Sequence, residues 1–162
     1  MSKEESKLEK LKKDYSEIQK KYSLPSFNEM NEDFSIEKIQ ENESEILVRE
    51  VRRHMAEKFS AYLRFLEMLL NPTGAPMFVF SVIKTLNAED KKKITEIYKQ
   101  LIKNEVNIIE LDIEFSENKE IEFIKSSFKM WRGMKDDLLD VVDSIKKKWD
   151  NKVEGNGKGY FG

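Results

Sequence analysis

The side chains with the clearest capacity for chemistry are lysines in two triplets. One triplet begins an expected helix after Asn87, and the other ends the following helix, before Trp149. If these helices form an antiparallel hairpin, both triplets lie at its open end. Clustered ammonium groups could then bind RNA, DNA or an acidic protein partner. With one further lysine, the candidate anionic-partner patch contains Lys91, Lys92, Lys93, Lys146, Lys147, Lys148 and Lys152.

Several features favour a simpler interpretation of these lysines. Lysines at the C-terminus of a helix complement its dipole, so the second triplet is partly explained by helix stability alone. Glu89, Asp90 and Asp150 dilute the positive charge, and Trp149 is the one aromatic residue near it that could stack on a base. We therefore treat nucleic-acid binding as the alternative rather than the leading function.

The single histidine does not predict a catalytic or metal site. His54 could share a helical face with Glu50 and Glu57. A helical di-iron site, however, needs two histidines, and a catalytic zinc site usually needs two or three. Because Arg52 and Arg53 precede it, we expect His54 at the boundary or surface, with a pH-sensitive contact or catalysis as alternatives. We expect the aspartates after residue 135 to form a solvated face: Asp136, Asp137, Asp140 and Asp143.

Motifs of nucleophilic and nucleotide-binding enzymes are missing from the sequence. The chain has no cysteine, no Gly-x-Ser-x-Gly elbow and no phosphate-binding loop. Gly157-Lys158-Gly159 lacks the Ser or Thr, the preceding strand and the following helix that such a loop requires. We therefore predict a protein that is not an enzyme, with no catalytic residue, cofactor or metal.

Two polar residues interrupt apolar helical seams, and a pair of aromatic residues ends the chain. Asn104 and Lys135 could specify register or a partner as single polar residues do in coiled coils, or they could lie at the rim of the seam. Tyr160 and Phe161 follow a glycine-rich stretch. That tail is a possible partner-binding ligand, with plain disorder as the alternative.

The element that positions most of these residues is a long helix near the C-terminus. Apolar residues from Ile121 to Trp149 recur at alternating steps of three and four, which predicts a heptad seam. A matching seam runs from Ile94 to Phe115, and the register slips by one residue near Ser116. These patterns predict an antiparallel hairpin of helices over 88–115 and 117–150. Alternation over residues 109–115 also resembles a strand, but no second strand is available to pair with it.

Three further helical segments surround this hairpin. A helix within 44–70 has two adjacent apolar stripes and should be central. The segment 76–86 is apolar nearly all round, so we expect it to be buried rather than to lie in a membrane interface. The first segment has a single apolar stripe that could dock on the hairpin or pair with another subunit.

Composition supports this all-α interpretation. Charged residues make up 37% of the 162 residues against 6 Gly and 3 Pro, which suits long helices facing water. The net charge of −2 gives no overall attraction to nucleic acid or to an anionic membrane. No stretch has the roughly 20 apolar residues of a membrane span. The charged N-terminus and the absence of cysteine favour a cytoplasmic protein.

The predicted fold is an extended, all-α helical bundle built on a long antiparallel hairpin, with a short buried apolar helix and an N-terminal arm. We expect an amphipathic arm over 1–24, a bundle domain over 25–152 and a flexible tail over 153–162. The expected function is a non-enzymatic interaction, scaffold or adaptor protein acting through helical surfaces. A protein partner is expected, and the N-terminal helix could form a homo-oligomer.

Overall fold

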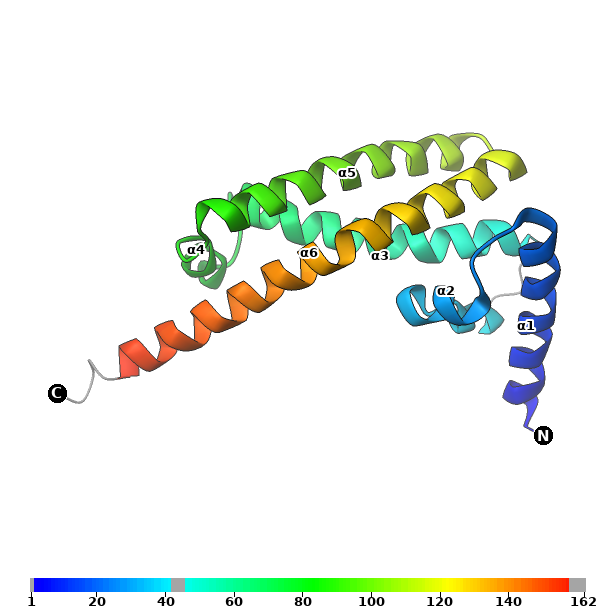
Figure 1. The fold of residues 1–162 in the computed structure, drawn as a ribbon, viewed down its shortest axis with the longest axis horizontal. Coiled ribbons are helices and arrows are strands. Elements are labelled where there is room, and N and C mark those ends of the chain that lie inside the picture. Colours follow the sequence, from blue (N-terminus) through cyan, green and yellow to red (C-terminus); the bar gives the residue numbers. More distant parts are fainter. Residues whose placement is uncertain (1, 42–45, 158–162) are drawn as a thin grey trace. The chain divides into compact units, whose positions relative to one another are not determined.

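The computed structural model describes residues 2–41 and 46–157, and all regular structure in these ranges is helical (Figure 1). The prediction of an all-α helical bundle is confirmed. The elements are α1 (Lys3–Tyr22), α2 (Phe27–Phe34), the 3₁₀ helix η1 (Ile36–Glu41), α3 (Leu47–Leu70), α4 (Met77–Ile83), α5 (Ala88–Ile113) and α6 (Glu117–Gly157).

The chain divides into two compact units, and the long helices α3, α5 and α6 each contribute to both. The first unit comprises Met1–Ser60 with Asn104–Met130, and the second comprises Ala61–Lys103 with Trp131–Gly162.

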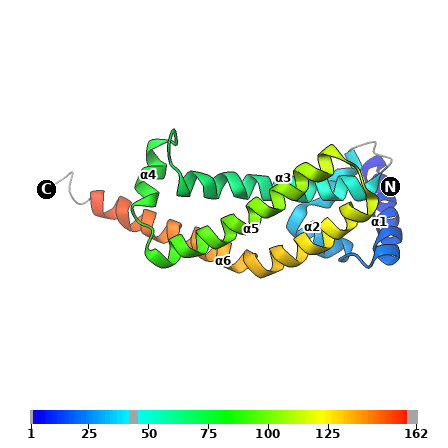
Figure 2. The same cartoon turned by 90° about the horizontal axis from the view of Figure 1, so that it is seen from above.

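Side-chain contacts join all three long helices within the first unit. Arg52 on α3 binds Asp112 on α5 and Glu120 on α6, and Asn104 on α5 donates a hydrogen bond to Ser127 on α6. Figures 1 and 2 show a short turn between the end of α5 and the start of α6, with the two helices side by side on leaving it. The predicted hairpin is present here, with its turn at residues 114–116.

The N-terminal helix packs inside the first unit against α2 and η1. Tyr15 is fully buried, its ring meets Phe27 edge-to-face at 5.6 Å, and its hydroxyl donates to the carbonyl oxygen of Pro25 at 2.7 Å. Burial, with a smaller contribution from Glu29, raises the pKa of Tyr15, which keeps this hydroxyl protonated as a donor. The most buried part of the α1 stripe is therefore occupied within the chain.

Capping chemistry sets the starts of α2 and α5. Ser26 and Glu29 form a reciprocal capping box at the start of α2. Asn87 and Asp90 exchange backbone-to-side-chain hydrogen bonds of 2.8 and 3.2 Å at the start of α5. The sequence 109–115 is helical through Ile113, so its alternation does not mark a strand.

In the second unit, Tyr62 on α3 stacks on Trp131 of α6 with ring centroids 5.3 Å apart, and Lys93 on α5 pairs with Asp140 on α6. Two segments differ from expectation here. The short helix α4 buries Val79 and Val82 but leaves Met77 and Phe78 exposed, so its burial is one-sided. Helix α6 continues to Gly157, beyond the predicted helical range of 117–150.

Candidate protein-binding surface

The most distinctive surface of the first unit is an apolar stripe on α5 that faces solvent. Val106, Ile109 and Ile113 are 61%, 52% and 81% exposed, and we call these three residues the outer stripe. Their steps of three and four place them along one side of the helix. Contiguous exposed apolar side chains are typical of interaction surfaces, whereas single scattered ones are normal on any protein surface.

The opposite side of the same helix faces the core. Ile108 and Leu111 are buried there, one and two positions away from Ile109. Successive helical residues turn by about 100°, so Leu111 points almost opposite to Ile109. In this part of the chain α5 therefore has two apolar sides, of which one is covered by the unit's own helices.

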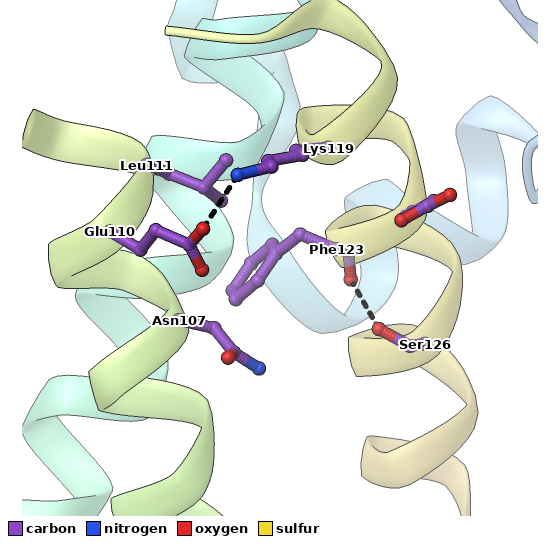
Figure 3. A pocket seen from close by; sticks show the side chains of 7 residues that line it. Asn107, Glu110, Leu111, Lys119, Phe123 and Ser126 are labelled. Atoms are coloured by element: carbon purple, nitrogen blue, oxygen red, sulfur yellow. Dashed lines mark hydrogen bonds and ion pairs between the residues drawn. The ribbon is translucent and has the colours of Figure 1, made fainter. Parts of the chain in front are cut away.

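A hollow lies between α5 and α6, and its lining includes Glu110, the residue that follows Ile109 of the outer stripe (Figure 3). Its volume is about 230 Å³. Lys119 spans it to reach the carboxylate of Glu110 at 2.6 Å, and the ring of Phe123 points into it from α6. The hydrogen bond that Lys119 donates to Glu110 raises the pKa of Lys119, so this lysine stays charged at neutral pH. The lining residues are Asn107, Glu110, Leu111, Lys119, Glu122, Phe123 and Ser126.

Acidic side chains surround the outer stripe. The segment from Asn104 to Asn118 has no basic residue, and its acidic residues are Glu105, Glu110, Asp112, Glu114 and Glu117. Asp112 binds Arg52, whose guanidinium lies on the core side, while the carboxyl group of Asp112 remains half exposed. Near the turn, Phe115 is 43% exposed, and the guanidinium of Arg49 lies 5.5 Å from its ring centroid.

A buried ionic cluster holds the core side of these helices. Arg52 and Glu120 are 1% and 0% exposed, and Arg52 Nε donates to Glu120 at 2.7 Å. Burial opposes the charge of Arg52, but the hydrogen bonds that Arg52 donates to Glu120 and Asp112 outweigh it and raise the pKa of Arg52. In the sequence, Arg52 stands out only as a neighbour of His54, and Glu120 is one carboxylate among many.

The two polar seam residues lie in different environments. Asn104 is 5% exposed, and its Nδ2 donates to Ser127 Oγ at 2.7 Å, so it belongs to the interior of the first unit rather than to its rim. Lys135 is half-buried on α6 in the second unit. Ser127, the partner of Asn104, was not anticipated because one serine in a long sequence gives no signal of its own.

Carboxylates engage part of the predicted lysine patch in the second unit. Lys93 lies within 4.0 Å of Glu89, Asp137 and Asp140, and Lys148 Nζ lies 2.5 Å from Asp90. Asp90 also accepts a hydrogen bond from Ser144. The remaining described lysines of the patch are exposed: Lys91, Lys92, Lys146 and Lys147. The side chain of Lys152 lies outside the described residues.

Other predicted features are placed as follows. His54 is half-buried on α3, and its Nδ1 has no hydrogen-bond partner among the described residues. Tyr160 and Phe161 lie outside the described residues. In the second unit, Met77, Phe78 and Phe80 on α4 are 83%, 57% and 39% exposed, so this short helix also presents apolar side chains to solvent.

Within residues 2–41 and 46–157, no group of His, Asp and Glu side chains is arranged to hold a metal ion. None of the helices in this part of the chain combines the length and apolar character of a membrane span. Comparison with protein-family models, curated proteins and solved structures finds no match.

Proposed function

We propose that this chain is a non-enzymatic interaction protein, a scaffold or adaptor, that binds a protein partner through the outer stripe of α5. The observation that carries the proposal is the exposure of Val106, Ile109 and Ile113 on a helix whose other side is packed. The cytoplasm is the expected location, on the basis of the cysteine-free sequence.

The apolar stripe of α1 is less available to a partner than the outer stripe of α5. The α1 stripe was the candidate for self-association, but Leu11 and Tyr15 are buried within the first unit. The outer stripe has no such cover from the described residues. It therefore offers more apolar area to a partner than α1 does.

Affinity purification from the native cell tests this proposal. The bait is the full chain, compared with a Val106→Ser/Ile109→Ser/Ile113→Ser variant and a Met77→Ser/Phe78→Ser control. We expect the outer-stripe variant to lose at least one protein that the wild type and the α4 control both retain. Identical sets of captured proteins for all three baits would reject the outer stripe as the binding surface.

The second candidate is a nucleic-acid or ribonucleoprotein accessory protein. Four exposed lysines at the ends of α5 and α6 favour it, whereas the pairing of Lys93 and Lys148 with carboxylates weakens it. A filter-binding titration with single-stranded and double-stranded RNA and DNA tests it at two salt concentrations. Binding that weakens with salt and is lost in a Lys91→Gln/Lys92→Gln/Lys146→Gln/Lys147→Gln variant would support this candidate.

A further inference from the structure

We propose that the outer stripe receives an amphipathic helix of a partner protein whose apolar residues are flanked by lysine or arginine. This inference rests on the proposed function and names the chemistry of the partner. It follows from the shape of the stripe, the charge around it and the hollow between α5 and α6.

The shape of the stripe suits a helix. Val106 and Ile113 lie seven steps apart with Ile109 between them, or about 10 Å along the axis at ~1.5 Å per residue. A partner helix with apolar residues at the same steps of three and four can interlock with them. An extended strand would need unpaired backbone groups to pair with, and α5 satisfies its own backbone groups internally.

The negative charge around the outer stripe favours a partner helix whose flanking residues are basic. Glu110, Asp112 and Glu114 are all exposed on α5. Lys119 pairs with Glu110 and Arg52 pairs with Asp112, so Glu114 and the outer side of Asp112 contribute most of the negative charge that a partner would meet. Arg52 pairs with Asp112 from the buried side, so the outer face of that carboxylate remains open to a partner. Complementary charge speeds association and disfavours partners with acidic flanks.

The hollow gives one flank a specific place to bind. Glu110 and Glu122 both line it, and the ring of Phe123 faces into it (Figure 3). A guanidinium or ammonium group from the partner would meet carboxylate acceptors there and would share Glu110 with Lys119. An arginine suits this position better than a lysine, because its planar group can bind a carboxylate through two parallel hydrogen bonds.

The same charges argue against a second copy of this chain as the occupant. Two outer stripes packed together would bring the carboxylates of two acidic segments close to one another. Like charges placed together at an interface oppose association. A helix with basic flanks has no such penalty.

Synthetic peptides test the inference without knowledge of the natural partner. The probe is a fluorescein-labelled amphipathic helix of about 18 residues, with leucines at steps of three and four flanked by lysine and arginine. A matched peptide carries glutamate at the flanking positions, and a third carries the basic composition in scrambled order. Fluorescence anisotropy with the full chain should show the basic amphipathic peptide binding about tenfold tighter than either control.

Variants of the full chain locate the binding. Ile109→Ser/Ile113→Ser should weaken binding of the basic peptide at least about tenfold. Glu110→Gln/Glu114→Gln should weaken it about threefold to tenfold and reduce its dependence on salt. Leu139→Ser and Asp136→Asn/Asp143→Asn change exposed apolar and acidic residues in the second unit, and both should bind as the wild type does. Circular dichroism checks that every variant remains folded.

Three results would overturn the inference. If the acidic peptide binds as tightly as the basic one, the surface does not select basic flanks. If the Ile109→Ser/Ile113→Ser variant binds the basic peptide as the wild type does, the outer stripe is not the binding site. The third result is a dimer that forms with increasing concentration in sedimentation velocity and is lost in that variant. If the wild type also fails to bind the peptides, the occupant of the outer stripe is a second copy of this chain. In that last case the outer stripe would still be an interaction surface. Failure of the proposed function would give a different result, because the outer-stripe variant would then capture the same proteins as the wild type in the affinity purification.

Discussion

The two sides of α5 in the first unit differ in what meets them, although both are apolar. The inner side places Ile108 and Leu111 in the core and adds Asn104, which hydrogen-bonds to Ser127. The outer side places Val106, Ile109 and Ile113 in solvent, with carboxylates around them. Apolar periodicity alone therefore does not identify the side that the chain itself covers.

Buried polar partners are the clearer difference between the two sides. Around the inner side, Arg52 meets Glu120 and Asp112, and Asn104 meets Ser127, so polar groups of the three long helices bind one another. Such contacts are satisfied only at one register of the helices. The outer side has charged groups near it, but the described residues form no buried polar pair there.

Removal of Glu120 should have the largest effect on stability. Glu120→Ala leaves the buried Arg52 guanidinium with Asp112 alone, so we expect a loss of about 3–5 kcal/mol in the free energy of unfolding. Urea denaturation followed by circular dichroism measures it. Glu122→Ala removes an equal charge from an exposed site two residues away and should change stability by less than about 0.5 kcal/mol. Equal losses in both variants would contradict the distinction between the two sides.

A matched pair of truncations on α5 tests the same distinction with apolar groups. Leu111→Ala should cost about 2–4 kcal/mol, because it opens a cavity in the core. Ile109→Ala removes similar bulk from the half-exposed outer stripe and should cost less than about 1 kcal/mol. A large loss from Ile109→Ala would mean that part of this chain covers the outer stripe in solution.

The sequence predicted the elements of the fold well because long helices repeat their signal. The seams from Ile94 to Phe115 and from Ile121 to Trp149 span many turns, so the hairpin could be predicted with its turn near Ser116. Short elements carry less signal. The α4 segment was expected to be buried, yet only Val79 and Val82 are covered, since a run of apolar residues does not reveal which of its sides meets the core.

The surface was harder to predict than the fold for a physical reason. Apolar and acidic residues alternate from position 109 to 115, with Ile109, Leu111, Ile113 and Phe115 as the apolar ones. A half-buried strand and a helix with two apolar sides can both have this pattern. Two residues of the buried polar contacts, Glu120 and Ser127, also gave no signal. A carboxylate in a charge-rich sequence is expected at the surface, and only the approach of Arg52 from another helix makes its burial favourable.

Asn104 offers a smaller test of the inner side. Asn104→Leu leaves the buried Ser127 hydroxyl without its donor, and we expect a loss of about 1–2 kcal/mol in the free energy of unfolding. The double variant Asn104→Leu/Ser127→Ala removes both polar groups and should recover most of this loss. Light scattering should give the same mass for all three proteins, because this contact lies within one chain. A change in mass for Asn104→Leu would instead place Asn104 at a contact between subunits.

The smallest expected effect concerns acid stability at the start of α5, in the second unit. Burial opposes ionisation of Asp90, but hydrogen bonds from Lys148, the Asn87 backbone and Ser144 outweigh it and lower the pKa of Asp90. The unfolded chain therefore takes up this proton at a higher pH than the folded chain does. The stabilising contribution is complete above the ordinary aspartate pKa of 3.8 and is lost as the pH falls through the lower folded value. Thermal unfolding between pH 7 and pH 2 should show a shallower acid decline for Asp90→Asn than for the wild type. Asp143→Asn, at an exposed position on α6, should retain the wild-type slope, and equal slopes in all three proteins would contradict a role for this contact.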